Sequence, residues 1–487
     1  MESLIISHAC SGKKRLGKDH LRRCVNDPIM HECTFRLPTK RNAVNHPHPA
    51  ASPSLTETLV SHIRTKPVND ADIEAAALFT LDAVANSLAG RNSEPGRILL
   101  DWWRASPSNA APDPGREAFL MGALCHILET DDLHRESVVH PGCVVVPAAW
   151  ALARKRGANG RSFLTSVLHG FEAAARVGMG VGPAHYKIWH NTATCGPFGS
   201  AMAAAALLGL EDGEAVHALG NAGSQSSGLW QFLETGAMTK HLHAGHAAEA
   251  GIRAAELAAF GFTGPPKILE GDKGFFRAAC PDADPEAVVR DASAPWQLTR
   301  TSIKPWPSCR HTHPTIDATE ELRTRLIADG HTPEDIAAVE VSTYQAALDV
   351  CDRPTATSDY EAKFSLQHAV AAGLLLPGVD FEAFGPEARQ RCADLAARVT
   401  VGAENPWTSA YPKSWGGRVR VKLTGGEEYE AVRTNAKGDP EAPLSRNEMI
   451  AKAEMLLRHG GVSAPAFIID GILALPLGSP LPDLGLT

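Results

Sequence analysis

The chain has 487 residues, of which 44% are hydrophobic and 21% charged, proportions that are ordinary for a globular protein. Residues 1–50 contain nine Lys and Arg against four Asp and Glu, whereas the whole chain has a formal net charge of −8. The rest of the chain is therefore acidic and lacks the basic face that a nucleic-acid-binding protein needs. No apolar run reaches the length of a membrane span, so we expect no membrane association.

The ten cysteines are scattered along the chain without a Cys-x-x-Cys pair. In a chain of this length the pattern is typical of reduced intracellular thiols rather than of a disulfide framework. Residues 1–30 also lack the apolar stretch and cleavage motif of a secretory signal. Together these features predict a cytoplasmic protein.

Residues 1–53 show no sustained hydrophobic periodicity and contain several basic clusters, so we predict a disordered extension. An organellar transit peptide is disfavoured by the acidic residues in this segment. A zinc site built from His20, Cys24, His31 and Cys33 is disfavoured as well, because their spacing does not match that of paired zinc ligands.

Residues 54–295 are dominated by helical periodicity. In the segment 70–90, apolar side chains recur on one stripe and Gly90 provides a C-terminal stop. Similar alanine-rich periodic segments follow, separated by short Gly and Pro breaks: Arg116 to Leu128, Val146 to Lys155, Gly160 to Val177, Ser200 to Leu208, Gly213 to Ala222 and Ala247 to Phe260. We therefore predict one large all-helical domain, in which the many small side chains allow helices to pack closely.

The pattern changes after residue 295. Four segments are β-branched or alternate between apolar and polar residues: 339–344, 398–401, 418–423 and 428–433. Gly425 and Gly426 predict a hairpin between the last two. Because helical segments intervene, residues 296–440 are predicted to form a smaller α+β domain. Residues 441–487 return to a helical pattern, and we expect them to pack back on the first domain.

The stretch from His126 to Pro147 concentrates acids and imidazoles and then becomes apolar. Between positions 129 and 140 it contains Glu129, Asp131, Asp132, His134, Arg135, Glu136 and His140. Pro141 and Gly142 interrupt any helix at that point. A dense set of ionisable groups that runs into a buried segment indicates the wall of a functional pocket.

Two further clusters precede alanine-rich helices. His190 is followed by Gly196 and Pro197, which predict free backbone N–H groups at a helix start, an arrangement suited to a carboxylate or phosphate. Lys240 and His243 are three residues apart and share a helix face. An ordinary helix start with solvated histidines is at least as good an explanation of either cluster taken alone.

The fourth cluster, Lys304 to Pro314, lies where the helical pattern gives way to the α+β pattern, a common position for ligand clefts. Arg310 is suited to hold a carboxylate through two parallel hydrogen bonds. For Cys309 the sequence identifies no base, so we interpret it as a small buried thiol. Together the four clusters combine cations that hold an anion with imidazoles that transfer protons near neutral pH.

At these clusters the chain resembles the MmgE/PrpD family, from about residue 55 to the C-terminus. The matching stretches are LDAVANSLAG (81–90), HILETDDLHRESVVHPG (126–142), WHNTATCGPFGSAMAAAALLGL (189–210), MTKHLHAG (238–245) and KPWPSCRHTHPTIDA (304–318). The resemblance implies a mainly α fold: a large all-helical domain, residues 54–295 with 441–487, and an inserted, smaller α+β lid domain, residues 296–440. It also implies a homodimer.

Carried over residue by residue, the resemblance implies a role for each cluster. His140 takes the position of the family's acid/base histidine, and Asp131, Asp132 and His134 match its acidic turn. The expected substrate-binding residues are His190, Lys240, Arg310 and His313. Members of the family act on small polycarboxylates by proton transfer next to a carboxylate, without an iron–sulfur cluster.

We therefore predict a lyase that acts on a small di- or tricarboxylate and needs no cofactor and no metal. The 2-methylcitrate dehydratase type is favoured, because animal decarboxylases of the family place His where this chain has Cys309. Cis-aconitate decarboxylase-like and iminodisuccinate epimerase-like enzymes are the alternatives. Two hypotheses of another class stay open: a metal-dependent enzyme that uses His134, His140, His243 and His313, and a non-catalytic binding protein.

Overall fold

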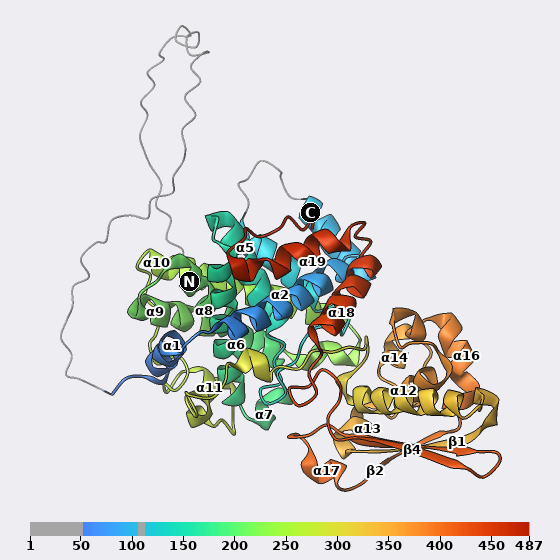
Figure 1. Cartoon of the computed structure of the whole chain (residues 1–487). Helices are drawn as coiled ribbons and strands as arrows, with labels where there is room; N and C mark the ends of the chain where they lie inside the picture. Colours follow the sequence, from blue (N-terminus) through green and yellow to red (C-terminus); the bar gives the residue numbers. More distant parts are fainter. Residues whose placement is uncertain (1–51, 106–112, 487) are drawn as a thin grey trace, which may run out of the picture. The chain divides into compact units, whose positions relative to one another are not determined.

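The structure is a computed structural model that describes residues 52–105 and 113–486. These residues are mainly α-helical and contain a four-stranded sheet (Figure 1), in agreement with the predicted mainly α class. None of the helices in these ranges has the length and apolar character needed to cross a membrane. Nearly all of the predicted extension, residues 1–53, lies outside the described ranges, as do His20, Cys24, His31 and Cys33.

The described part of the chain begins with helices that, apart from the short α7 (Pro183–Tyr186), contribute side chains to one hydrophobic core. They are α1 (Leu55–Thr65), α2 (Asp70–Gly90), α3 (Glu94–Arg104), α4 (Pro114–Cys125), α5 (Gly142–Arg156), α6 (Gly160–Met179), α7 (Pro183–Tyr186), α8 (Asn191–Leu208), α9 (Asp212–Gly223), α10 (Thr239–Ala259) and α11 (Phe275–Ala279). Small residues permit close approach where these helices cross. A Cβ atom on Gly251 of α10 would clash with the backbone of Ala201 on α8, so this contact requires glycine.

Two of these helices begin earlier than predicted. The expected helix from Val146 starts at Gly142, and the one expected from Ser200 starts at Asn191, so that Pro147 and Pro197 lie inside helices. Each proline removes one helical hydrogen bond. Almost every residue of both helices is buried, and the free energy of that burial outweighs the local preference for a break.

The sheet has the strand order β2-β1-β3-β4, in which β1 and β2 are parallel and the other pairs antiparallel. Its strands are β1 (Ile336–Thr343), β2 (Val399–Ala403), β3 (Gly417–Leu423) and β4 (Glu428–Arg433). The hairpin predicted at Gly425 and Gly426 joins β3 to β4, with Gly426 at a φ of 91°. Every second residue of β3 is buried, because alternate side chains point to the core face.

A second hydrophobic core lies between the sheet and its helices. The helices of this part are α12 (His313–Ala328), α13 (Gln345–Cys351), α14 (Asp359–Lys363), α15 (Leu366–Leu375), α16 (Pro386–Ala396) and α17 (Trp407–Ala410). In Figure 1, α12 covers one face of the sheet. This core contains residues from Ile316 to Ala431 and is separate from the first.

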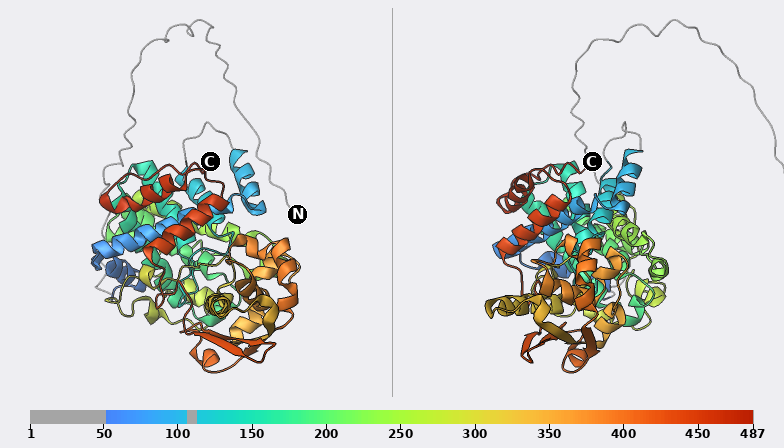
Figure 2. Two further views of the ribbon diagram at one scale, coloured as in Figure 1. Left: turned by 45° about the vertical axis from the view of Figure 1, so that its right-hand side comes forward. Right: turned by 90° about the vertical axis from the view of Figure 1, so that its right-hand side faces the viewer.

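The last two helices, α18 (Arg446–His459) and α19 (Pro465–Leu473), pack against α2. Figures 1 and 2 show them in red beside the blue α2. Leu456, Leu457 and Ile472 belong to the first core, so the chain returns to its N-terminal helices after the sheet. The domain boundaries near residues 295 and 440, and the description of the α+β part as a lid, remain predictions.

Candidate active site

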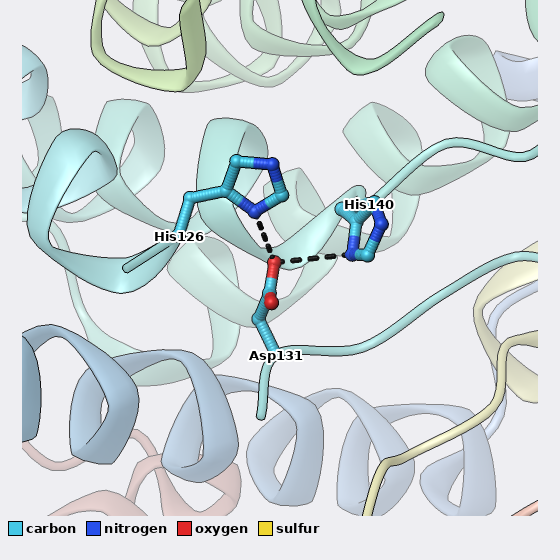
Figure 3. Close-up of side chains that lie close together, drawn as sticks. All are labelled: His126, Asp131 and His140. Atoms are coloured by element: carbon cyan, nitrogen blue, oxygen red, sulfur yellow. Dashed lines mark hydrogen bonds and ion pairs between the residues drawn. The ribbon is translucent and has the colours of Figure 1, made fainter. Parts of the chain in front are cut away.

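Asp131 lies between two imidazoles in the turn that joins α4 to α5. Its Oδ2 atom is 2.6 Å from Nδ1 of His126 and 3.1 Å from Nδ1 of His140 (Figure 3). Asp131 and His126 are fully buried, whereas 13% of the His140 side chain is exposed. Because Nδ1 of His140 faces the carboxylate, its Nε2 atom is left for a reacting group. This is the arrangement in which a carboxylate orients an acid/base histidine.

The charges of this cluster follow from burial and from one another. Burial lowers the pKa of His126 to about 3, although Asp131 opposes the shift, and it lowers the pKa of His140 against the same opposing effect. Burial would raise the pKa of Asp131, but its two histidines and Lys304 hold it well below its usual value. Near neutral pH the cluster therefore consists of one carboxylate between two neutral imidazoles.

Asp132 has a different position from its neighbour. Both of its carboxylate oxygens accept from the backbone N–H of Gly142, at 3.0 Å, where α5 begins. A Cβ atom on Gly142 would lie 2.9 Å from both oxygens, so glycine lets the carboxylate reach the helix start. Burial, together with the charges of Asp131 and Asp82, raises the pKa of Asp132 well above its usual value. Asp132 thus anchors the turn to α5 and does not contact the imidazoles.

His134 is buried and makes its contacts outside this cluster, and its predicted catalytic role stays a prediction. Its Nδ1 atom is 2.8 Å from Oγ of Ser137 and its Nε2 atom is 3.0 Å from Oε1 of Gln297. Burial lowers its pKa to about 3, so it is neutral. With both ring nitrogens engaged, His134 holds the shape of the turn, which closes where its backbone N–H donates to Val139.

Two lysines and Glu129 lie beside Asp131. Lys240, at the start of α10, forms an ion pair with Glu129. Lys304 Nζ donates to the backbone carbonyl of Glu129 at 3.1 Å and lies 3.7 Å from its carboxylate and 3.9 Å from that of Asp131. Glu129 has a φ of 63°, an unfavourable backbone conformation for this residue type. The two lysines form the cationic side of the site.

Lys304, Glu129 and His126 were not among the predicted site residues. Lys304 comes next to the reactive cluster because Ser302 pairs with Leu133 as an isolated β-bridge, with both N···O distances at 2.8 Å. This pairing joins the fourth sequence cluster to the first. The signal available in the sequence was a lysine inside the same motif as Arg310, which does not by itself show which of the two faces the site.

The ring of His190 packs against the ring of His126. As the residue before α8, it places its ring 5.4 Å from the ring of His126, nearly parallel at 11°. Its Nδ1 atom is 3.3 Å from Nδ1 of His243, and its ring is 4.6 Å from that of Trp230. Burial, together with the nearby charge of Lys240, lowers the pKa of His190 well below its usual value. The first three sequence clusters, represented by His126, His190 and His243, therefore meet at this point.

Arg310 and His313 are buried with partners inside the protein. A guanidinium nitrogen of Arg310 is 2.5 Å from Oδ1 of Asp439, an oxygen that also accepts from Ser302 at 2.6 Å. His313 Nε2 lies 3.2 Å from the carbonyl of Ser308. Arg310 thus has an internal carboxylate partner, and its role in binding substrate stays a prediction. No sequence pattern links Arg310 to Asp439, because they lie far apart in the chain.

The ligand set of the metal hypothesis is not assembled. Among the described residues, the group of metal-type donor atoms that lie within 4.8 Å of one another consists of His126, Asp131 and His140. Of the set predicted from the sequence, this group contains His140 alone. His126 Nδ1 and Asp131 Oδ2 are hydrogen-bonded at 2.6 Å, whereas His140 Nδ1 lies 3.1 Å from the same oxygen without the geometry of a hydrogen bond.

The sequence of the chain matches the models of a known family. The MmgE/PrpD N-terminal domain matches residues 56–288 and the MmgE/PrpD C-terminal domain matches residues 306–468. The chain belongs to the MmgE/PrpD family, as the resemblance in the sequence predicts.

Several characterised relatives are named cis-aconitate decarboxylases. The human protein is 28% identical over 352 residues, which cover 68% of this chain and 72% of that protein. The mouse protein is 27% identical over 459 residues, or 86% of this chain and 90% of that protein. A cis-aconitate decarboxylase-like protein, oryM, of Aspergillus oryzae is 30% identical over 276 residues, or 52% and 57%.

Proposed function

We propose that the protein is a lyase that removes CO2 from a small unsaturated polycarboxylate, a decarboxylase of the cis-aconitate type. The observation that carries this proposal is the pair of Asp131 and His140 beside the two lysines, an acid/base group next to an anion-binding site. Dehydration of 2-methylcitrate, the type favoured by the sequence, uses the same groups, but the relatives favour decarboxylation. Cys309 remains the residue that argues for dehydration.

Lys240 and Lys304 are suited to hold the carboxylates of the substrate. Both ammonium groups contact Glu129, whose burial opposes its charge while the two lysines hold the pKa of its carboxyl well below the usual range. On this proposal a substrate carboxylate shares or replaces those contacts. Such ion pairs orient the substrate, and in a buried site they are stronger than in water.

His140 supplies the proton that the reaction requires. As the bond to the leaving carboxylate breaks, CO2 departs and the electron pair moves into the adjacent double bond. His140, neutral near neutral pH, takes up a proton from solvent at Nε2, and the far carbon of that double bond then receives this proton. Asp131 stabilises the imidazolium before the transfer, and a positioned acid of this kind contributes roughly 10²–10⁴-fold in rate. His126 holds the same oxygen of Asp131, Oδ2, through a hydrogen bond of 2.6 Å.

The proposal is tested by incubating the enzyme with cis-aconitate in heavy water and following the products by NMR. We expect CO2 and an unsaturated dicarboxylate that carries one deuterium from solvent. 2-Methylcitrate and iminodisuccinate are offered in parallel, because loss of water and inversion at carbon give different products. Turnover of 2-methylcitrate with no reaction of cis-aconitate would instead establish the dehydratase.

A His140→Gln variant tests the role of His140, because it keeps a polar side chain of similar size but cannot take part in proton transfer. Decarboxylation should fall by at least about 10²-fold, while binding of the substrate, measured by calorimetry, stays within a few-fold. A variant that retains the full rate would remove His140 from the mechanism, and a variant that loses binding would assign it to substrate affinity instead.

A further inference from the structure

Cys309 differs in exposure from the other cysteines in the part of the chain that the structure describes. It is partly exposed, which corrects its interpretation from the sequence as a small buried thiol. The remaining cysteines in these ranges are buried, and all of them are free thiols: Cys125, Cys143, Cys195, Cys280, Cys351 and Cys392. Cys309 is therefore the thiol among them that a dissolved oxidant reaches most easily, and exposure is one of the properties that make a cysteine susceptible to oxidation.

Cys351 lies directly against Cys309, although the two are far apart in the chain. Its thiol is the hydrogen-bond partner of the Cys309 sulfur. Cys309 precedes the short helical turn η4 (Arg310–Thr312), and Cys351 is the last residue of α13. These two elements pack against each other, and His311 Nδ1 lies 2.7 Å from the hydroxyl of Tyr344, the residue before α13. The fold thus brings two free thiols into contact.

Neighbouring groups favour the thiolate form of Cys309. The thiol of Cys351 and the backbone N–H of His311 donate to its sulfur, and the positive charge of Lys304 lies nearby. Against the effect of burial, these groups hold the pKa of Cys309 below its usual value. In contrast, the same hydrogen bond and burial raise the pKa of Cys351 well above its usual value. Because the thiolate is the nucleophile in cysteine chemistry, Cys309 is the reactive member of the pair and Cys351 stays protonated.

The position of the pair permits a bond between the two sulfur atoms. Cys309 and Cys351 both lie at an end of a helical element, where the backbone is less constrained than inside a helix. The other thiols of the described ranges are protected, because burial raises the pKa of each: Cys125, Cys143, Cys195, Cys280 and Cys392. The charges of Lys304 and Glu129 both act on Cys309, so the pair lies next to the cationic side of the candidate active site.

From this arrangement we propose that Cys309 and Cys351 are a modification site, a pair of thiols that a peroxide converts reversibly into a disulfide. The Cys309 thiolate attacks one oxygen of the peroxide and becomes a sulfenic acid, while the O–O bond breaks and the leaving hydroxide takes up a proton to form water. The Cys351 sulfur then attacks the sulfenic sulfur, and the hydroxyl group leaves as water with the Cys351 proton. The thiols are oxidised by two electrons and hydrogen peroxide is reduced to two water molecules. No substrate takes part, so the inference is independent of the proposed function.

Peptide mapping by mass spectrometry tests the inference on the full chain after treatment with hydrogen peroxide. We expect two peptides joined through Cys309 and Cys351, which dithiothreitol separates again. Cys309 should be oxidised at least about tenfold faster than Cys351 is oxidised in a Cys309→Ser variant, because the two thiols differ widely in their thiolate fractions. The absence of the joined peptides, or a bond from Cys309 to a different cysteine, would overturn the inference.

Two further variants separate the steps. Cys351→Ser should stop the reaction at the sulfenic acid of Cys309, which dimedone traps as a stable adduct, whereas the wild type should give little adduct because the disulfide closes. Cys392→Ser is the matched control, since it removes a buried cysteine whose pKa burial raises to about 11, and it should form the same joined peptides as the wild type. Circular dichroism shows whether each variant is folded, and the wild-type peptide map needs no variant. Equal amounts of adduct at Cys309 in the wild type and in Cys351→Ser would overturn the role of Cys351.

Discussion

A buried ion pair between Asp82 and Lys452 lies next to the turn that contains Asp131. Lys452 on α18 places Nζ 2.5 Å from Oδ1 of Asp82 on α2, and at most 4% of either side chain is exposed. The same ammonium donates to the backbone carbonyl of Thr130 at 2.7 Å. Thr130 directly precedes Asp131, so this lysine connects α18 to the turn that contains Asp131. We expect its removal to be among the most destabilising single changes in the protein.

The magnitude follows from the burial of both charges. Lys452→Met leaves the Asp82 carboxylate in the interior without a cation, which costs about 3–5 kcal/mol. Asp82→Asn leaves the ammonium unpaired at a similar cost. If the two effects were independent, the double variant would lose about 6–10 kcal/mol of its free energy of unfolding. Because neither of the two introduced side chains carries a charge, we expect the double variant to lose only about 1–3 kcal/mol, chiefly for the hydrogen bond to Thr130.

Urea unfolding of the full chain near neutral pH, followed by circular dichroism, measures the free energy of unfolding of the wild type, the two single variants and the double variant. The pair Glu74 and Arg446 is a matched control, because it joins the same two helices at 3.0 Å but is about half exposed, at 48% and 49%. Its coupling energy should be about 0–1 kcal/mol. If the buried pair shows a coupling energy no larger than that of the control, the reasoning from burial is wrong.

Three further outcomes are expected. Asp131→Asn should lower kcat by about 10²–10⁴-fold with a small change in KM, measured by steady-state decarboxylation; a loss below tenfold would contradict its role. Gly142→Ala should lower stability by about 1–3 kcal/mol, because its Cβ would crowd Asp132, whereas Gly213→Ala, with open space around it, should not lower Tm. Six buried or partly buried histidines have pKa values of about 3 or 4: His126, His134, His169, His241, His243 and His311. The unfolded chain binds these protons near pH 6.5, so Tm should fall as the pH drops from about 6.5 toward 4; a constant Tm across that range would refute this.

The sequence by itself determined the elements and the composition of the site. Apolar side chains at helical spacing predicted the helices of residues 54–295, and alternation predicted β3 and β4, because these patterns depend on neighbours along the chain. The acids and imidazoles around Asp131 indicated a pocket for the same reason, since their density is a local property. The resemblance then related His140 and Lys240 to one family of enzymes.

Only the tertiary structure decided what each of these groups contacts. Adjacent residues such as Asp131 and Asp132 have the same side chain, yet one faces two imidazoles and the other anchors α5. Lys304 reaches the site, whereas Arg310 in the same motif is held by Asp439. These outcomes depend on which distant segments pack together, and burial then sets the charge of each group. Such contacts have no counterpart in the spacing of residues along the chain.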